Sequence, residues 1–102
     1  MHVIARRTIR RFADEHADAR KPLQAWLACV ERAEWASIED VRRQFSHADA
    51  VKVGSGRYAI VFNIKGNAYR LITAIHFNRG KVYTLRFMTH AEYDKDDWKR
   101  QL

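Results

Sequence analysis

Residues 57–76 read RYAIVFNIKGNAYRLITAIH, and their pattern indicates the architecture of the whole chain. Two alternating apolar runs, 57–64 and 67–76, flank Lys65-Gly66, which is typical of a β-hairpin whose tight turn uses the positive φ that glycine tolerates. Because side chains alternate across a strand, a two-residue turn assigns every residue to a face. The face predicted to enter the core carries Tyr58, Ile60, Phe62, Ile64, Tyr69, Leu71, Thr73 and Ile75. The opposite face carries Asn63 and Arg70 among small residues and is predicted to be open.

A third strand is predicted from Lys81 to Met88. Its apolar residues Tyr83, Leu85 and Phe87 can all enter the core if the preceding loop, residues 78–80, has three residues and ends with Gly80 in a left-handed conformation. The same alternation places three side chains on the open face beside Arg70, and these are Thr84, Arg86 and Met88. Arg70, Arg86 and Asn63 are therefore expected to converge.

Helical spacing dominates the rest of the chain. After a short apolar opening that could be a strand, residues 1–4, apolar side chains at three- and four-residue steps predict helices over 9–16, 22–30 and 38–45. Thr89 and Glu92 resemble a capping box that starts a C-terminal helix, with His90 in its first turn and Tyr93 three residues further on. The predicted fold class is α+β in one domain, residues 1–102, with helices on one face of a small antiparallel sheet and the other face partly bare.

Positive charge is concentrated in the second half of the chain. The net charge is +7, and residues 51–91 contain seven Lys or Arg but no Asp or Glu. A surface that collects positive charge without carboxylates suits a polyanion, because contacted phosphates release their counterions. The predicted partner is therefore RNA or DNA. Arg6 and Arg10 of the first helix could also bind phosphate, although a charge run on a helix is more often a solvated face.

Several other classes of protein are disfavoured. A single cysteine, Cys29, cannot form an intramolecular disulfide, and no apolar run approaches the ~20 residues that span a bilayer. The N-terminus lacks the order of segments found in a signal peptide, so a cytoplasmic protein without membrane contact is expected. The five histidines are scattered, and neither a metal nor another cofactor is predicted.

The run FNIKGNAYRL at 62–71, followed by Val82-Tyr83 and by THAEYD at 89–94, resembles the HigB toxins of bacterial type II toxin–antitoxin modules. The resemblance covers nearly the full length. It implies a RelE-like microbial ribonuclease fold and an mRNA interferase that cuts messenger on the translating ribosome. It also implies neutralisation by a HigA antitoxin with a helix-turn-helix domain, through which alone DNA would be contacted.

By position in these motifs, Arg70 and Tyr93 match the catalytic arginine and tyrosine of the family, and His90 matches its motif histidine. The arginine of the last strand commonly stands one place earlier in the family, at Leu85 here, so the resemblance leaves the role of Arg86 open.

The residue chemistry agrees with RNA cleavage. When the 2′-OH of the substrate is the nucleophile, a site needs a proton acceptor, a proton donor and cations for the developing charge. The predicted catalytic residues are Arg70, His90, Tyr93 and Arg86. The predicted RNA contacts are Lys65, Asn63, Arg57, Lys81, Arg6 and Arg10. Arg70→Ala is expected to leave the fold intact, because the side chain is predicted to be exposed.

Structural roles are the alternative for the same residues. The Thr-His-x-Glu sequence can simply start a helix, Arg70 can pair with Asp94 or Asp96, and Tyr93 can anchor the helix to the sheet. The alternative functions are a non-catalytic RNA-binding module and a degenerate toxin that acts only in a repressor complex with its antitoxin.

Overall fold

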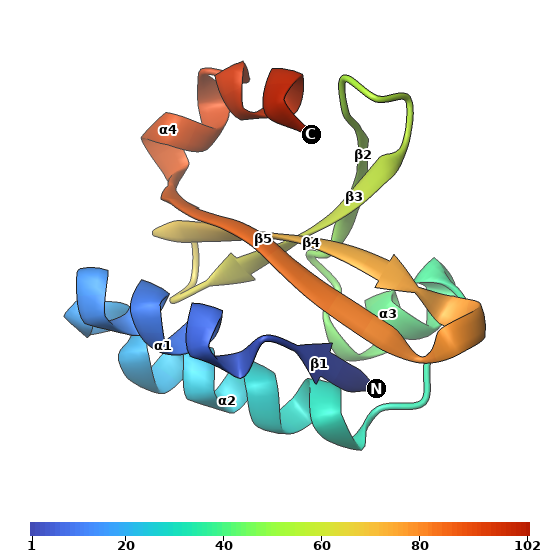
Figure 1. Ribbon diagram of the computed structural model, residues 1–102. Coiled ribbons are helices and arrows are strands. Elements are labelled where there is room, and N and C mark those ends of the chain that lie inside the picture. The colour runs from blue at the N-terminus through green and yellow to red at the C-terminus, as the bar shows by residue number, and fades with distance from the viewer.

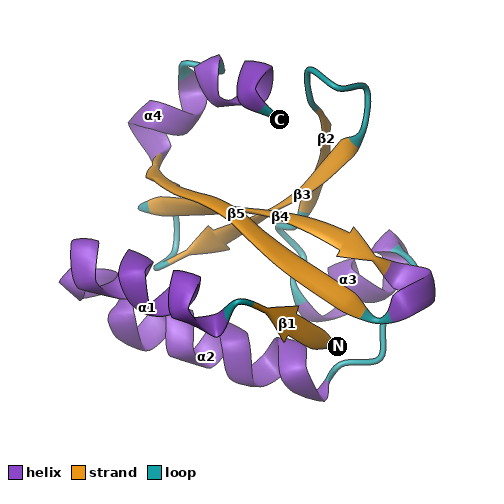
Figure 2. Ribbon diagram, in the orientation of Figure 1, coloured by secondary structure: helices purple, strands orange, loops and turns teal.

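The computed structural model describes all residues, 1–102, and places helices on both sides of a five-stranded sheet (Figures 1 and 2). The elements in chain order are β1 (His2–Ile4), α1 (Arg6–Glu15), the 3-10 turn η1 (Ala17–Ala19), α2 (Arg20–Arg32), α3 (Ile38–Gln44), β2 (Asp49–Lys52), β3 (Tyr58–Ile64), β4 (Tyr69–His76), η2 (Phe77–Arg79), β5 (Lys81–Thr89), α4 (His90–Asp94) and η3 (Asp97–Gln101). The α+β prediction is confirmed.

The sheet is mixed, with strand order β1-β5-β4-β3-β2. The four strands from β2 to β5 pair antiparallel, whereas β1 joins the edge of the sheet parallel to β5. The predicted antiparallel sheet is therefore extended by one parallel strand at its edge, and β2 was not predicted. Both edge strands are too short, at three and four residues, to show an alternating pattern in the sequence.

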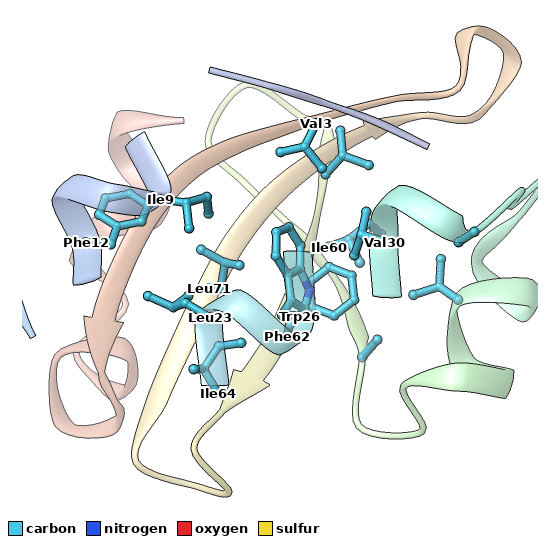
Figure 3. Packing of buried hydrophobic residues seen from close by; sticks show 14 of the residues in the cluster. Val3, Ile9, Phe12, Leu23, Trp26, Val30, Ile60, Phe62, Ile64 and Leu71 are labelled. Carbon is cyan, nitrogen blue, oxygen red and sulfur yellow. The ribbon is translucent and has the colours of Figure 1, made fainter. Parts of the chain in front are cut away.

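The main core lies between the helices and one face of the sheet (Figure 3). Apolar stripes of α1 and α2 supply buried residues such as Phe12, Leu23 and Trp26. Phe62 of β3 meets the Trp26 ring in a T-shaped contact, with ring centroids 5.4 Å apart, and stacks on Trp35 at 6.2 Å. The apolar faces predicted for the helices are thus the faces that pack against the sheet.

The turn between β3 and β4 is longer than predicted. Ile64 pairs with Tyr69, so residues 65–68 form a four-residue connection in which both Lys65 and Gly66 have positive φ. Since four and two residues differ by an even number, the predicted faces are retained, and Ile60, Phe62, Ile64, Leu71 and Thr73 are buried. Tyr58 is the exception, because its side chain at the start of β3 is 62% exposed.

Two deviations from the predicted register, each of one residue, cancel along β5. His76 pairs with Lys81, so the loop has four residues rather than three, and Val82 enters the core in place of Tyr83. Thr84 pairs with the buried Thr73, whereas Arg86 pairs with Ile72, which leaves Leu85 as an extra residue in a β-bulge. The predicted core positions of Tyr83 and Leu85 and the predicted open position of Thr84 are therefore wrong.

Beyond the bulge the original alternation returns. Phe87 packs against the main core as predicted, while Arg86 and Met88 lie on the second face of the sheet with Arg70. The register shift thus decides which side of the sheet each residue of β5 occupies.

The second face is not bare. A C-terminal segment, residues 90–102, lies over it on the side opposite α1 and α2 (Figure 1). Beneath this segment is a second apolar cluster, consisting of Val53, Ala59, Val61, Ile72, Met88 and Trp98. Trp98 is only 6% exposed. The prediction of an open face is wrong for the middle of the sheet, because the sequence pattern did not show where the C-terminal segment would pack.

Gly54, in the loop between β2 and β3, holds the far end of this segment. Its backbone N–H donates to the Lys99 carbonyl at 2.8 Å, and a Cβ at this position would lie 3.0 Å from the same oxygen. This close approach of the Lys99 carbonyl explains why a glycine occupies position 54. None of the helices combines the length and apolar character needed to cross a membrane.

Candidate active site

Arg70 is fixed at the end of β4 by the turn that precedes it. Nη1 donates to the carbonyls of Asn67 and Tyr69 at 3.2 and 3.1 Å, and Nη2 donates to Oδ1 of Asn67 at 2.6 Å. The residue is only 8% exposed, which corrects the prediction of an exposed arginine. Three of the five guanidinium donors are used, and Nε makes no hydrogen bond.

No carboxylate neutralises Arg70. Asp94 and Asp96, its expected alternative partners, pair instead with His90 at 3.2 Å and with Lys99 at 3.0 Å. A buried charge that lacks an ionic partner is costly to the fold. Arg70 therefore presents an uncompensated positive charge at a position determined by hydrogen bonds.

Tyr93 lies beside this guanidinium. The Arg70 Cζ atom is 5.6 Å from the centroid of the Tyr93 ring, which is a cation–π distance. Burial raises the pKa of the Tyr93 phenol, and the nearby Asp49 carboxylate acts in the same direction. The hydroxyl is therefore protonated at neutral pH and suited to donate a proton or a hydrogen bond.

Trp98 also contacts Tyr93. The two rings stack with centroids 5.2 Å apart and an interplanar angle of 22°, and the indole Nε1 donates to the Tyr93 carbonyl at 3.1 Å. The anchoring role that was the structural alternative for Tyr93 is present, together with its contact to Arg70.

His90 occupies the first turn of α4, as predicted. The Thr89 side chain accepts from the Glu92 N–H while the Glu92 carboxylate accepts from the Thr89 N–H, so the predicted capping box forms. The imidazole is partly exposed and pairs through Nε2 with Asp94, and it makes no hydrogen bond or ring contact with Arg70 or Tyr93. His90 and Tyr93 lie on neighbouring parts of the helix surface because they are three residues apart.

Arg86 lies on the same sheet face as Arg70 but is held separately. Its Nη1 donates to the carbonyl of Leu85, the bulged residue, at 2.8 Å. Because two residues of a bulge oppose one residue of the partner strand, Leu85 and Arg86 share the position opposite Ile72, while Thr73 pairs with Thr84. Asn63 lies directly opposite Arg70 in the register, as its expected convergence requires.

Two of the predicted RNA contacts are engaged elsewhere. Lys65 pairs with Asp18 at 2.9 Å, and Tyr69 donates to the same carboxylate at 2.7 Å. The hydrogen bonds from Tyr69 and Lys65 lower the pKa of Asp18, which favours the ionised carboxylate. Arg6 pairs with Glu31 between the two N-terminal helices.

The remaining predicted contacts, Arg57, Lys81 and Arg10, take part in no ion pair, but they are dispersed. Arg10 lies on α1, which covers the opposite face of the sheet from Arg70. Of the seven basic residues between positions 51 and 91, only Lys65 has a carboxylate partner. Most of the positive charge of residues 51–91 is therefore not neutralised by carboxylates in the folded protein.

Asn67 and Trp98 were missed by the sequence analysis. Asn67 follows a glycine in the turn, where a structural role is usual, and its contact with Arg70 depends on the longer connection. Trp98 follows four acidic or basic residues, and no periodic pattern marks it as buried. No group of three or more His, Cys, Asp or Glu side chains is arranged to hold a metal ion.

Comparison with known proteins adds to this geometry. Residues 19–96 match a family model described as HigB toxin, the RelE-like toxic component of a toxin-antitoxin system. The mRNA interferase toxin HigB of Escherichia coli K12 is 28% identical over 94 residues, which cover 92% of this chain and 88% of that protein. The mRNA interferases HigB of Escherichia coli O157:H7 and Shigella flexneri show the same identity and coverage. The family match contains the Arg70 turn, the bulged strand and α4.

Proposed function

Because this chain belongs to the HigB family of RelE-like toxins from toxin–antitoxin systems, we propose that it inhibits translation by cleaving mRNA on the ribosome. The related proteins named mRNA interferases support an endoribonuclease activity. The partner that such a system supplies is an antitoxin, here proposed to be a HigA-type helix-turn-helix protein, through which alone the toxin would reach DNA.

The observation that carries the nuclease proposal is the uncompensated charge of Arg70. Its guanidinium is buried, positioned by Asn67 and without a carboxylate, and two donors remain, including Nε–H. A guanidinium can donate two parallel hydrogen bonds to a phosphate. The cost of burying this charge in the free protein is offset when a scissile phosphate supplies the missing negative charge.

The proposed reaction uses the 2′-OH of the substrate as nucleophile. His90 accepts the 2′-OH proton as the 2′ oxygen bonds to phosphorus, Arg70 stabilises the phosphorane charge, and Tyr93 donates a proton to the departing 5′ oxygen. The products are a 2′,3′-cyclic phosphate and a 5′-OH. A neutral imidazole that donates Nε2–H to Asp94 leaves Nδ1 as the acceptor, so Asp94 is assigned an orienting role.

We assign to Arg86, on the same face as Arg70, the role of a second cation, and to Arg57 and Lys81 contacts with flanking phosphates. Asn63 pairs with Arg70 in the register, which supports its assignment as a hydrogen-bonding group for the substrate. Lys65, Arg6 and Arg10 remain candidates only for longer-range attraction of the polyanion, because of their ion pairs or their distance from this face.

A reconstituted translation reaction tests the function directly. We expect the purified protein to cut mRNA within the ribosome and to leave 2′,3′-cyclic phosphate ends, detected by primer extension and end-group analysis. Binding to mRNA or ribosomes without cleavage would support the non-catalytic RNA-binding module. Complex formation with the antitoxin without either activity would support a degenerate toxin.

His90→Ala is expected to slow single-turnover cleavage by ~10²-fold, since a positioned general base contributes typically 10²- to 10⁴-fold and ribosomal groups share the work. The measurement is the cleavage rate at saturating toxin as a function of pH. The variant should lose the part of this pH–rate profile that reflects titration of the general base. His47→Ala is the matched control, because His47 is exposed and lies far along the chain in the α3–β2 loop. Unchanged cleavage by His90→Ala would return this residue to a role in the helix start.

A further inference from the structure

A groove with a volume of about 880 Å³ opens on the same sheet face as Arg70, at the opposite end of β4. Its floor includes Ala59 of β3, Ala74 of β4 and Leu85 of β5. Alternation places Arg70, Ala74 and His76 on one side of β4, and the six residue-to-residue steps from Arg70 to His76 span roughly 20 Å at ~3.3 Å per step. Ile72 of the second apolar cluster lies between Arg70 and Ala74 on this side of β4, and neither Arg70 nor Tyr93 lines the groove, so the groove is a separate site.

The groove results from the deviations in β5. The bulge brings the Leu85 side chain into the lining, and the small side chains of Ala59 and Ala74 leave the space above the strands unfilled. Val53 and the C-terminal Leu102 contribute further apolar walls. Such a concave, apolar lining suits an aliphatic or aromatic side chain of a ligand.

Tyr58 at the edge of this groove is the one large hydrophobic residue of the chain that is largely exposed, at 62%. An exposed aromatic side chain next to an apolar depression is a common feature of protein interfaces, where aromatic residues contribute much of the binding free energy. The groove and Tyr58 together form a continuous apolar surface.

The rim of the groove is positive. Arg57 lines it without an ion-pair partner, and no Asp or Glu side chain belongs to the lining. Lys52 pairs with Tyr58 and Lys81 with His76 in the strand register, so both lie next to lining residues, and neither has a carboxylate partner. The complementary ligand is therefore acidic at its edges and apolar at its centre.

We propose that this groove binds an acidic segment of the antitoxin, with one large apolar side chain on the floor of Ala59, Ala74 and Leu85 and carboxylates beside Arg57. The proposal rests on the antitoxin partner of the proposed function. An RNA strand would gain from the positive rim, but its phosphodiester backbone gains nothing from an aliphatic floor. A protein segment satisfies both halves of the site.

The test compares antitoxin affinity with cleavage. Tyr58→Ala removes the exposed aromatic edge, and Ala74→Leu fills the floor. Each is expected to weaken binding of the purified cognate antitoxin by ~30-fold in calorimetric titration, the loss typical of an interface hot spot. Cleavage of mRNA in the ribosome should be unchanged in both variants. Ala28→Leu is the matched control for added volume, because Ala28 is exposed on α2, on the other side of the sheet.

Three results would separate the possibilities. Unchanged antitoxin affinity in both Tyr58→Ala and Ala74→Leu would overturn the proposal. Reduced cleavage with unchanged antitoxin affinity would overturn it in favour of an RNA subsite. Reduced antitoxin affinity in a protein whose wild-type form cuts no mRNA would support the docking site and reject the proposed nuclease function. Since Tyr58 is exposed, its substitution should preserve the melting temperature, and this variant decides the matter if Ala74→Leu misfolds.

Discussion

Arg70→Lys is expected to reduce the single-turnover rate of mRNA cleavage by ~10³-fold, the scale measured for loss of a transition-state donor or of an arginine in phosphoryl transfer. Lysine keeps the charge but has no planar fork, so it cannot bind Asn67 and a phosphate at the same time. The measurement is the cleavage rate at saturating toxin, with ribosome binding determined in parallel.

Arg79→Lys is the matched control, because it makes the same exchange at an exposed arginine of the same acid-free stretch. Full cleavage activity of a folded Arg70→Lys protein would reject the assignment of Arg70 to the reaction. Arg70→Ala is a poorer test, because it leaves the oxygens of Asn67 without their donor and removes the cation from the Tyr93 ring. We expect it to cost about 2 kcal/mol of stability as well as activity.

Trp98→Ala is expected to detach the C-terminal segment while the main core remains folded. The indole is the largest side chain of the second cluster, and loss of a buried tryptophan costs about 3–5 kcal/mol. Because this cluster is separate from the helix-covered core, the cost falls first on the local stability of residues 90–102. Tyr93 then loses the stacked ring and the hydrogen bond that position it.

Hydrogen exchange measures this local opening. The Gly54 amide, which donates to the Lys99 carbonyl, should lose protection, whereas amides of β4 beneath the helices should retain it. Cleavage by Trp98→Ala should fall by ~10²-fold because Tyr93 is no longer held in position. Trp98→Phe preserves an aromatic stack on Tyr93, so it should restore much of the Gly54 protection and of the cleavage rate. Equal loss of protection at Gly54 and at the core strands would show global unfolding instead and would remove the positioning role of Trp98.

Local patterns in the sequence predicted much of the fold. Period-three-to-four spacing identified α1, α2 and α3, and the capping box identified the start of α4, because helices and caps depend on residues a few positions apart. The faces of β3 and β4 were also correct. Their turn was misjudged by two residues, but an even error leaves the alternation intact.

The sequence by itself therefore determined the α+β class, the helix-covered face of the central hairpin and the motifs that contain Arg70, His90 and Tyr93. Only the tertiary structure decided the side of the sheet that Tyr83 and Leu85 occupy, because a loop and a bulge each shift the register by one residue without a periodic signal. It also decided that Arg70 is buried beneath a segment that joins Trp98 to Tyr93. The physical reason is that alternation is a local property, whereas burial depends on contacts between residues far apart in the chain.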